Sequence, residues 1–488
     1  MGIPAGLAPA PVTPQAGRPA WALVCASLGF GLVVMHTTAV NIALPDIQAA
    51  LGGEVAALQW CVNAYALALA TLLLPFGALA DRFGARRMFL LGMGTFAAAS
   101  LVCSTAPGIA VLIAGQATAG VGAAMVAPTA LALVREAYPD PGGRVRAIGK
   151  LSLGLAAGFG LGPVIGGALV DLVSWRAVFL IDVPVAAGLS LCALLLVAPS
   201  APRPGRAPDP AGVALGALAV GGLAFTLTEA GQAGWLSAVV LAGAGVSVVT
   251  MAGFAWWERR SPAPLLPPRL RAVATVRWAA GIGLVFNVMV YGEIFVLSLA
   301  FQQAQGLTPL EAGLLFIPQP IGTILIAVTT GRWVARSGPR PALLAGLALS
   351  AVAALILLGF DAGPFPLAVI VALLLTGIGG GLVVPSLHAM IAVDAPADLV
   401  GIAAAALNAS RQVGGVLGVA VMGSLVAAAG LTNGARAAFA VAALTQIGAL
   451  LFVALRVPGG PARRPRPPRA ERQIDVAIAT SICRSSHG

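Results

Sequence analysis

Long apolar runs separated by short polar loops dominate the chain. A membrane-spanning helix needs about 20 mostly apolar residues. Fourteen runs meet this requirement, at about 21–45, 57–80, 87–105, 109–134, 147–170, 176–198, 211–229, 236–257, 277–301, 311–333, 341–360, 364–392, 401–428 and 434–457. We therefore predict fourteen transmembrane helices. The first run has no convincing small-residue cleavage site, so we expect it to be a retained helix.

The composition fits an all-α polytopic membrane protein. Of the 488 residues, 59% are hydrophobic and 9% charged, whereas soluble domains are about 25% charged. The net charge of +11 comes from basic residues scattered in short loops, and without a basic domain we expect no nucleic-acid partner. The scattered cysteines and histidines have no metal-ligand spacing, so we expect no metal site.

Arginine positions predict the orientation, because cytoplasmic loops are enriched in Arg and Lys. One side of the predicted membrane carries nearly all of these residues, and the other carries little more than Arg176 and Arg436. Both termini are therefore predicted to be cytoplasmic. Residues 1–18 and 459–488, rich in Pro, Ala and Arg, are expected to be disordered.

Three segments recur in order along the chain. GALADRFGARR from Gly77 matches GRWVARSGPRP from Gly331, residues 119–129 resemble 376–386, and the pair Gly158 and Gly162 matches a pair 256 residues later. Repeated halves are typical of transporters whose substrate site lies between them. We predict a cytoplasmic tail (1–20), a six-helix half (21–198), a linker with two extra helices (199–275), a second six-helix half (276–457) and a basic cytoplasmic tail (458–488).

The loop after the second span has a defined motif. Gly77 permits close helix approach, Gly84 a tight turn, and Asp81 can accept hydrogen bonds. With Arg82, and with Arg86 and Arg87 as basic anchors, this segment resembles the signature loop of the major facilitator superfamily. The resemblance implies a conformational latch in which Asp81 and Arg82 engage the other half and release during transport.

The fifth span carries glycines at every fourth position. Gly154, Gly158, Gly162 and Gly166 share one helix face, against which another backbone can pack closely. This face alone could serve only packing. Together, Gly158, Gly162, Pro163, Gly166 and Gly167 resemble the antiporter motif of the superfamily. With fourteen spans, the resemblance points to the drug:proton antiporter branch of the EmrB/QacA type.

The first span departs from that branch. MHTTAVNIALP matches its first-span motif at Thr38, Asn41 and Pro45, but His36 stands where the branch has aspartate. Histidine titrates near neutral pH and could take a proton, although it offers no negative charge to a cationic drug. The alternative is a neutral histidine that contributes only packing. In the fourth span, Gln116 replaces a family arginine and supplies no charge.

Three other ionisable residues lie in apolar runs, where a charge is costly. Glu293 is the best remaining carboxylate, Arg411 could pair with a carboxylate or bind an anionic substrate, and Asp182 could be functional or simply exposed to water. The proton and substrate candidates are therefore His36, Asn41, Gln116, Asp182, Glu293 and Arg411.

No Walker loop or catalytic cluster is present, so we expect neither an enzyme nor a cofactor. The resemblance implies a cell-membrane exporter of small lipophilic drugs or secondary metabolites, driven by the proton gradient and functional as a monomer in the lipid bilayer. The alternative is an uptake symporter or uniporter of the same superfamily for a small organic solute.

Overall fold

The described part of the chain is built from helices. The computed structural model describes residues 19–200, 209–359, 367–396 and 398–458. Within these residues, fourteen helical segments are long and apolar enough to cross a membrane, which confirms the predicted number of spans. Both predicted disordered segments, 1–18 and 459–488, lie outside the described residues.

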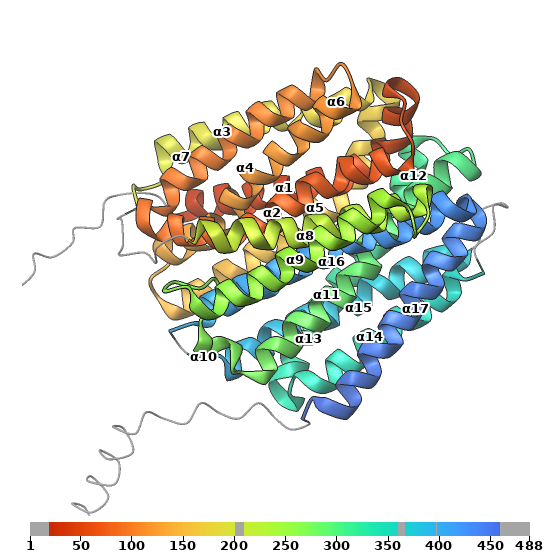
Figure 1. Ribbon diagram of the computed structural model, residues 1–488. Helices are drawn as coiled ribbons and strands as arrows, with labels where there is room; N and C mark the ends of the chain where they lie inside the picture. The colour runs from red at the N-terminus through yellow and green to blue at the C-terminus, as the bar shows by residue number, and fades with distance from the viewer. Residues whose placement is uncertain (1–18, 201–208, 360–366, 397, 459–488) are drawn as a thin grey trace, which may run out of the picture.

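The helices form three consecutive groups (Figure 1). The N-terminal group contains α1 Pro19–Leu51, α2 Val55–Phe83, α3 Ala85–Ser104, α4 Ile109–Ala137, α5 Pro141–Leu172, α6 Trp175–Leu180 and α7 Asp182–Leu196. The middle group contains α8 Pro210–Ala233, α9 Ala238–Arg260 and α10 Pro268–Arg271. The C-terminal group contains α11 Ala274–Leu299, the π-helix η1 Ala300–Ala304, α12 Pro309–Leu315, α13 Pro318–Ser337, α14 Pro339–Leu357, α15 Leu367–Asp394, α16 Val400–Ala429 and α17 Leu431–Arg456.

Two predicted spans are interrupted. The span predicted at 176–198 breaks at Ile181 between α6 and α7, and the span predicted at 311–333 breaks between α12 and α13. Proline follows each break, at Pro184 and Pro318, and its missing N–H removes one helical hydrogen bond. The first break makes Asp182 the first residue of α7, where the helix dipole favours a negative charge.

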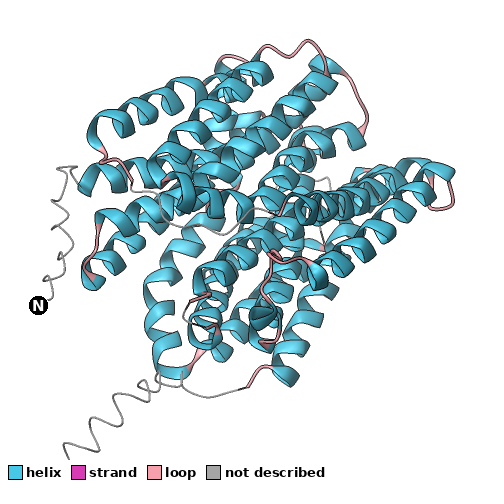
Figure 2. Ribbon diagram, turned by 60° about the vertical axis from the view of Figure 1, so that its left-hand side comes forward, coloured by secondary structure: helices cyan, strands magenta, loops and turns pink. Residues whose placement is uncertain are grey.

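The N-terminal and C-terminal groups pack in the same way and form two bundles. Figure 2 shows the helical assembly from a second side. Helix α1 runs along α5 as α11 runs along α16, and α4 packs on α2 and α3 as α15 packs on α13 and α14. The recurring glycines make the same contact in both bundles. A β-carbon on Gly158 would collide with the backbone of Gly31 in α1, and one on Gly414 would collide with Leu284 in α11. The sequence repeat is therefore a repeat of helix packing.

The two middle spans cover the junction of the bundles. Helix α8 packs against α2 of one bundle and α16 of the other, and α9 packs against α8 (Figure 1). Because the number of spans is even, Pro19 and Arg456 lie at the same end of the molecule. We call this the terminal end, and the opposite end, which contains α6 and α12, the far end.

Gly84 makes the turn between α2 and α3. Its φ is +93°, a region that residues with a side chain rarely adopt. A β-carbon at this position would lie 2.8 Å from the carbonyl oxygen of Ser200. Gly338, its counterpart in the repeat, joins α13 to α14 with a φ of +80°. Both turns therefore require glycine for the same conformational reason.

We expect Gly84→Ala to destabilise the protein by about 1–2 kcal/mol, the cost of placing a β-carbon in left-handed backbone. The thermal unfolding temperature of the purified protein measures the effect. Gly94→Ala on α3 is the matched control, because a β-carbon there meets open space and alanine favours a helix. Equal unfolding temperatures for Gly84→Ala and the wild type would contradict the expected backbone strain at this position.

Candidate functional site

His36 is the centre of a polar cluster inside the N-terminal bundle. Its side chain is 1% exposed. The ring nitrogen Nδ1 lies 2.6 Å from Oδ2 of Asp182 on α7, and Nε2 lies 2.8 Å from Oε1 of Gln116 on α4. Three of the six candidates from the sequence therefore meet at one place. The alternative of a water-exposed Asp182 is wrong, since this residue is 0% exposed.

The cluster can hold histidine in either charge state. A protonated imidazole donates from both nitrogens, which suits the carboxylate on one side and the amide oxygen of Gln116 on the other. A neutral imidazole has one N–H for Asp182 and needs a donor at its other nitrogen. Rotation of the Gln116 amide supplies that donor. Gln116 thus accommodates a change of charge that a family arginine at this position would oppose.

Asp182 has one further polar contact and one oxygen without a partner in the described structure. Ser100 on α3 donates to Oδ2 over 3.2 Å. The other carboxylate oxygen, Oδ1, is buried and has no hydrogen-bond partner in the described structure. A proton could therefore be held between His36 and Asp182 or on the free carboxylate oxygen.

Aromatic rings shield this cluster. The rings of Tyr65, Phe96 and Phe179 lie 5.0, 5.1 and 5.8 Å from the His36 ring. Tyr65 donates its hydroxyl to the carbonyl oxygen of Val33 over 2.9 Å. In such low-dielectric surroundings a charge on His36 depends strongly on its partners.

The other candidates are more loosely distributed. Asn41 donates to Thr37 of its own helix, and its side-chain oxygen has no partner in the described residues. Glu293 on α11 is 0% exposed and accepts a hydrogen bond from Thr376 on α15 over 3.2 Å. Arg411 on α16 is half-buried and donates to Asn408 over 3.3 Å. Neither Glu293 nor Arg411 joins the His36 cluster.

The two bundles are hydrogen-bonded at the far end. Among the described residues, the hydrogen bonds between bundles are Gln59 to Val419 and Ala420, Ser298 to Asn41, Gln302 to Ile42, Gln303 to Gln48, and Leu310 to Asp171. All of these residues lie in the far-end parts of their helices. This conformation is therefore closed at the far end.

Comparison with known proteins identifies the family to which this architecture belongs. The family model for the Major Facilitator Superfamily matches residues 20–212 and 280–486. The chain belongs to the Major Facilitator Superfamily. It is 33% identical to "Multidrug resistance protein Stp" of Mycobacterium tuberculosis (strain CDC 1551 / Oshkosh), an alignment that covers 83% of this chain and 75% of the relative. It is 34% identical to "Methylenomycin A resistance protein" of Streptomyces coelicolor, over 81% of this chain and 83% of the relative.

Solved structures of other superfamily transporters share the fold. A peptide transporter POT in complex with sulfate superposes with a TM-score of 0.66 at 16% identity, covering 91% of this chain and 96% of that one. The human organic anion transporter MFSD10 superposes with a TM-score of 0.62 at 17% identity, covering 89% and 100%. The chain is thus a multi-pass membrane protein of a superfamily that acts on small molecules.

The signature loop of the superfamily lies at the terminal end. Asp81 and Arg82 are exposed, and Asp81 has no hydrogen bond or ion pair within the described residues. Nothing in this conformation shows the latch contact with the other bundle. Arg86 instead donates to the carbonyl oxygens of Ala193 and Leu194 at the end of α7, where a cation is favourable. Its repeat counterpart Arg340 does the same for Ala454 in α17.

The glycine motif of α5 contacts both bundles. Gly158, Gly162 and Gly166 face α1, and β-carbons on them would collide with Gly31, Thr38 and Ala39. On another face, Gly167 lies against Pro309 of α12, and the carbonyl of Pro163 lies against Gly313. Helix α5 therefore connects the helix that carries His36 to the opposite bundle.

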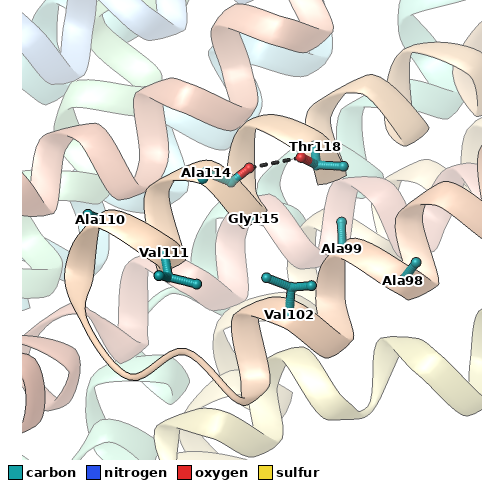
Figure 3. Close-up of a pocket in the computed structure, with 8 residues that line it drawn as sticks. All are labelled: Ala98, Ala99, Val102, Ala110, Val111, Ala114, Gly115 and Thr118. Atoms are coloured by element: carbon teal, nitrogen blue, oxygen red, sulfur yellow. Dashed lines mark hydrogen bonds between the residues drawn. The ribbon is translucent and has the colours of Figure 1, made fainter.

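A groove of about 430 Å³ lies between α3 and α4 (Figure 3). Its lining is almost entirely apolar and small: Ala98, Ala99, Val102, Ala110, Val111, Ala114, Gly115 and Thr118. The Thr118 hydroxyl is hydrogen-bonded to Ala114 of its own helix. Most of these residues are exposed on the outside of the bundle, so the groove is separate from the His36 cluster.

Ser100, Tyr65 and Gln59 contribute to the site or to the contact between the bundles without being among the residues predicted from the sequence. Tyr65 had a usable signal, because the chain has only 3 tyrosines and this one falls inside an apolar run. Gln59 also falls in an apolar run, as a buried amide that donates across the bundles. Ser100 had no such signal, since serine is common in membrane helices.

Proposed function

We propose that this transporter exports small lipophilic drugs or secondary metabolites in exchange for protons. It would work by alternating access in the cell membrane, as a monomer, with the proton gradient as its energy source and no cofactor. The observation that carries the proposal is the buried cluster of His36, Asp182 and Gln116. A group that can change its charge inside one bundle is the element that proton coupling requires.

The named relatives support the direction of transport. They include "Multidrug resistance protein Stp", "Methylenomycin A resistance protein" and "Tetracenomycin C resistance and export protein". The glycine motif of α5 supports antiport by resemblance. We infer that this chain, like a resistance protein, moves its substrate out of the cell.

The arginine distribution supports a cytoplasmic terminal end. Both chain termini would then be cytoplasmic, and the hydrogen-bonded far end would face outside. The conformation described above would be the one that receives substrate from the cytoplasm. Proton binding at the His36 cluster would take place when the far end is open. A membrane potential would supply about 2.3 kcal/mol per charge per 100 mV to drive the inward movement of the proton.

Transport by purified protein in liposomes tests the proposal. A pH gradient is imposed, and uptake is measured for cationic dyes and for neutral and anionic antibiotics. We expect at least one compound to accumulate against its gradient, and accumulation to collapse when an uncoupler removes the pH gradient. Accumulation that is insensitive to the uncoupler, or transport of every substrate only down its gradient, would overturn proton-coupled export.

Locking the far end should stop transport. The side chain of Gln303 donates to Gln48 across the bundles over 2.9 Å, so the two thiols of Gln48→Cys/Gln303→Cys should be within reach of a short bis-methanethiosulfonate cross-linker. The background variant has the native cysteines replaced by serine: Cys25, Cys61, Cys103, Cys192 and Cys483. We expect cross-linking to reduce liposome transport to background and a reductant, which cleaves the cross-link, to restore it.

The single variants Gln48→Cys and Gln303→Cys, treated with the same cross-linker, are the matched controls and should keep their activity. Full transport by the cross-linked double variant, with the cross-link verified by mass spectrometry, would contradict alternating access through the far end.

A further inference from the structure

Arg411 is a cation inside the C-terminal bundle that has no carboxylate partner among the described residues. The ion pairs found among the described residues are His36 with Asp182, Arg269 with Asp398, and Arg271 with Glu258. Arg411 has one hydrogen bond, to the side-chain oxygen of Asn408, and its Nε is buried without a partner in the described structure. A charge in the middle of a membrane is costly unless it is compensated. A bound anion would therefore stabilise this guanidinium.

The neighbours of Arg411 are neutral polar groups. Tyr291 on α11 and His388 on α15 lie close enough to interact electrostatically with it. The Tyr291 hydroxyl donates to Gln412 over 3.5 Å. Glu293 is on the same helix as Tyr291, but its carboxylate is directed to Thr376. Uncharged polar groups thus surround Arg411, and the carboxylate of Glu293 is directed elsewhere.

This group of residues lies at the junction of the bundles. Tyr291 lies near Tyr65 of the N-terminal bundle, and the Tyr65 ring is 5.0 Å from His36. Accessibility differs between the two sites. Arg411 and its neighbours Tyr291, His388, Asn408 and Gln412 are all half-buried, whereas His36 and Asp182 are almost completely buried. Arg411 therefore keeps accessible surface, whereas His36 and Asp182 keep almost none.

We propose that Arg411 binds the acidic group of the exported molecule. The substrates would then be amphipathic organic anions, with a carboxylate, sulfonate or phenolate on an apolar body. A guanidinium forms strong, directional hydrogen bonds with such groups. The proposal deepens the proposed function and rests on it for the direction of transport, while the binding itself needs no proton gradient. Proton and substrate would occupy different bundles, with Tyr65 and Tyr291 between them.

Two fluorescent dyes with the same ring framework test the charge requirement. 1-Anilinonaphthalene-8-sulfonate carries a sulfonate, and N-phenyl-1-naphthylamine lacks it. Both are titrated onto the full-length protein in lipid nanodiscs, and empty nanodiscs give the lipid background. Arg411→Gln should weaken binding of the sulfonate dye about tenfold or more, the effect of losing a charged hydrogen bond. Binding of the neutral dye should stay within about twofold.

Arg411→Lys keeps the charge and should retain part of the sulfonate affinity. Arg332→Gln, an exposed arginine of the same bundle, is the matched control and should change neither dye. Unchanged sulfonate binding in Arg411→Gln would overturn the proposal. An equal loss for both dyes would also overturn it, because it would give Arg411 a structural role.

The dye result and the proposed function can fail independently. Loss of sulfonate binding in Arg411→Gln supports the anion site even if the liposomes show no proton-coupled transport. Proton-coupled export that persists in Arg411→Gln, with sulfonate binding unchanged, removes the anion site and leaves the exporter.

Discussion

Alanine in place of His36 is expected to abolish proton-driven export. The ring bridges Asp182 and Gln116 at 2.6 and 2.8 Å, and alanine removes both the proton acceptor and the bridge. Loss of a positioned proton-transfer group typically lowers a rate by a hundredfold or more, and we expect about that loss in accumulation driven by a pH gradient. Accumulation in liposomes with an imposed gradient measures it.

Substrate exchange at equal pH separates coupling from binding. This exchange needs no net proton movement, so His36→Ala should retain it while gradient-driven accumulation disappears. Asp182→Asn should behave similarly, because an uncharged amide neither takes up a proton nor stabilises a protonated imidazole as the carboxylate does. Thr129→Ala is the matched control: its hydroxyl is buried and bonded within its own helix. Normal gradient-driven accumulation by His36→Ala would reduce the cluster to a packing role.

Leucine in place of Gly162 is expected to prevent stable folding of the N-terminal bundle. A β-carbon at this position would collide with Thr38 and with the backbone of Met35. Overpacking commonly costs about 1–3 kcal/mol, and a backbone collision leaves little room for relaxation. We expect at least about 3 kcal/mol of destabilisation, seen as loss of the monodisperse peak and of transport.

Gly188→Leu is the matched control for this prediction. Gly188 is exposed on α7, and a β-carbon there meets open space. This variant should keep the elution profile and thermal unfolding temperature of the wild type. Wild-type stability in Gly162→Leu would contradict the close packing of α5 on α1.

The helical architecture was predictable because the membrane imposes it. Apolar runs of the required length identify the spans, and glycines at spacing four mark the faces where helices meet. The breaks within two spans were harder to predict. Proline is tolerated inside α1, α2, α4, α5 and α15. Pro184 and Pro318, in contrast, each follow a break in the helix. Tertiary packing decides between these outcomes, and no local pattern reports it.

The site was predictable only as separate residues. An ionisable group in an apolar run was sufficient to select His36, Asp182, Glu293 and Arg411. The sequence could not indicate that His36 meets Asp182, which is 146 residues away. Their contact depends on the break that places Asp182 at the start of α7, and on the packing of α7 against α1. A contact between residues so far apart in the sequence is determined by the tertiary fold and is not visible in a local sequence pattern.

Proton movement driven by substrate alone is the most direct test of drug:proton antiport. Liposomes containing the wild-type protein and a trapped pH-sensitive dye are given an outward gradient of a transported compound, with equal pH on both sides. We predict proton flow into the liposomes as the compound leaves, and no such flow with His36→Ala. Departure of the compound from wild-type liposomes without any change in internal pH would contradict antiport.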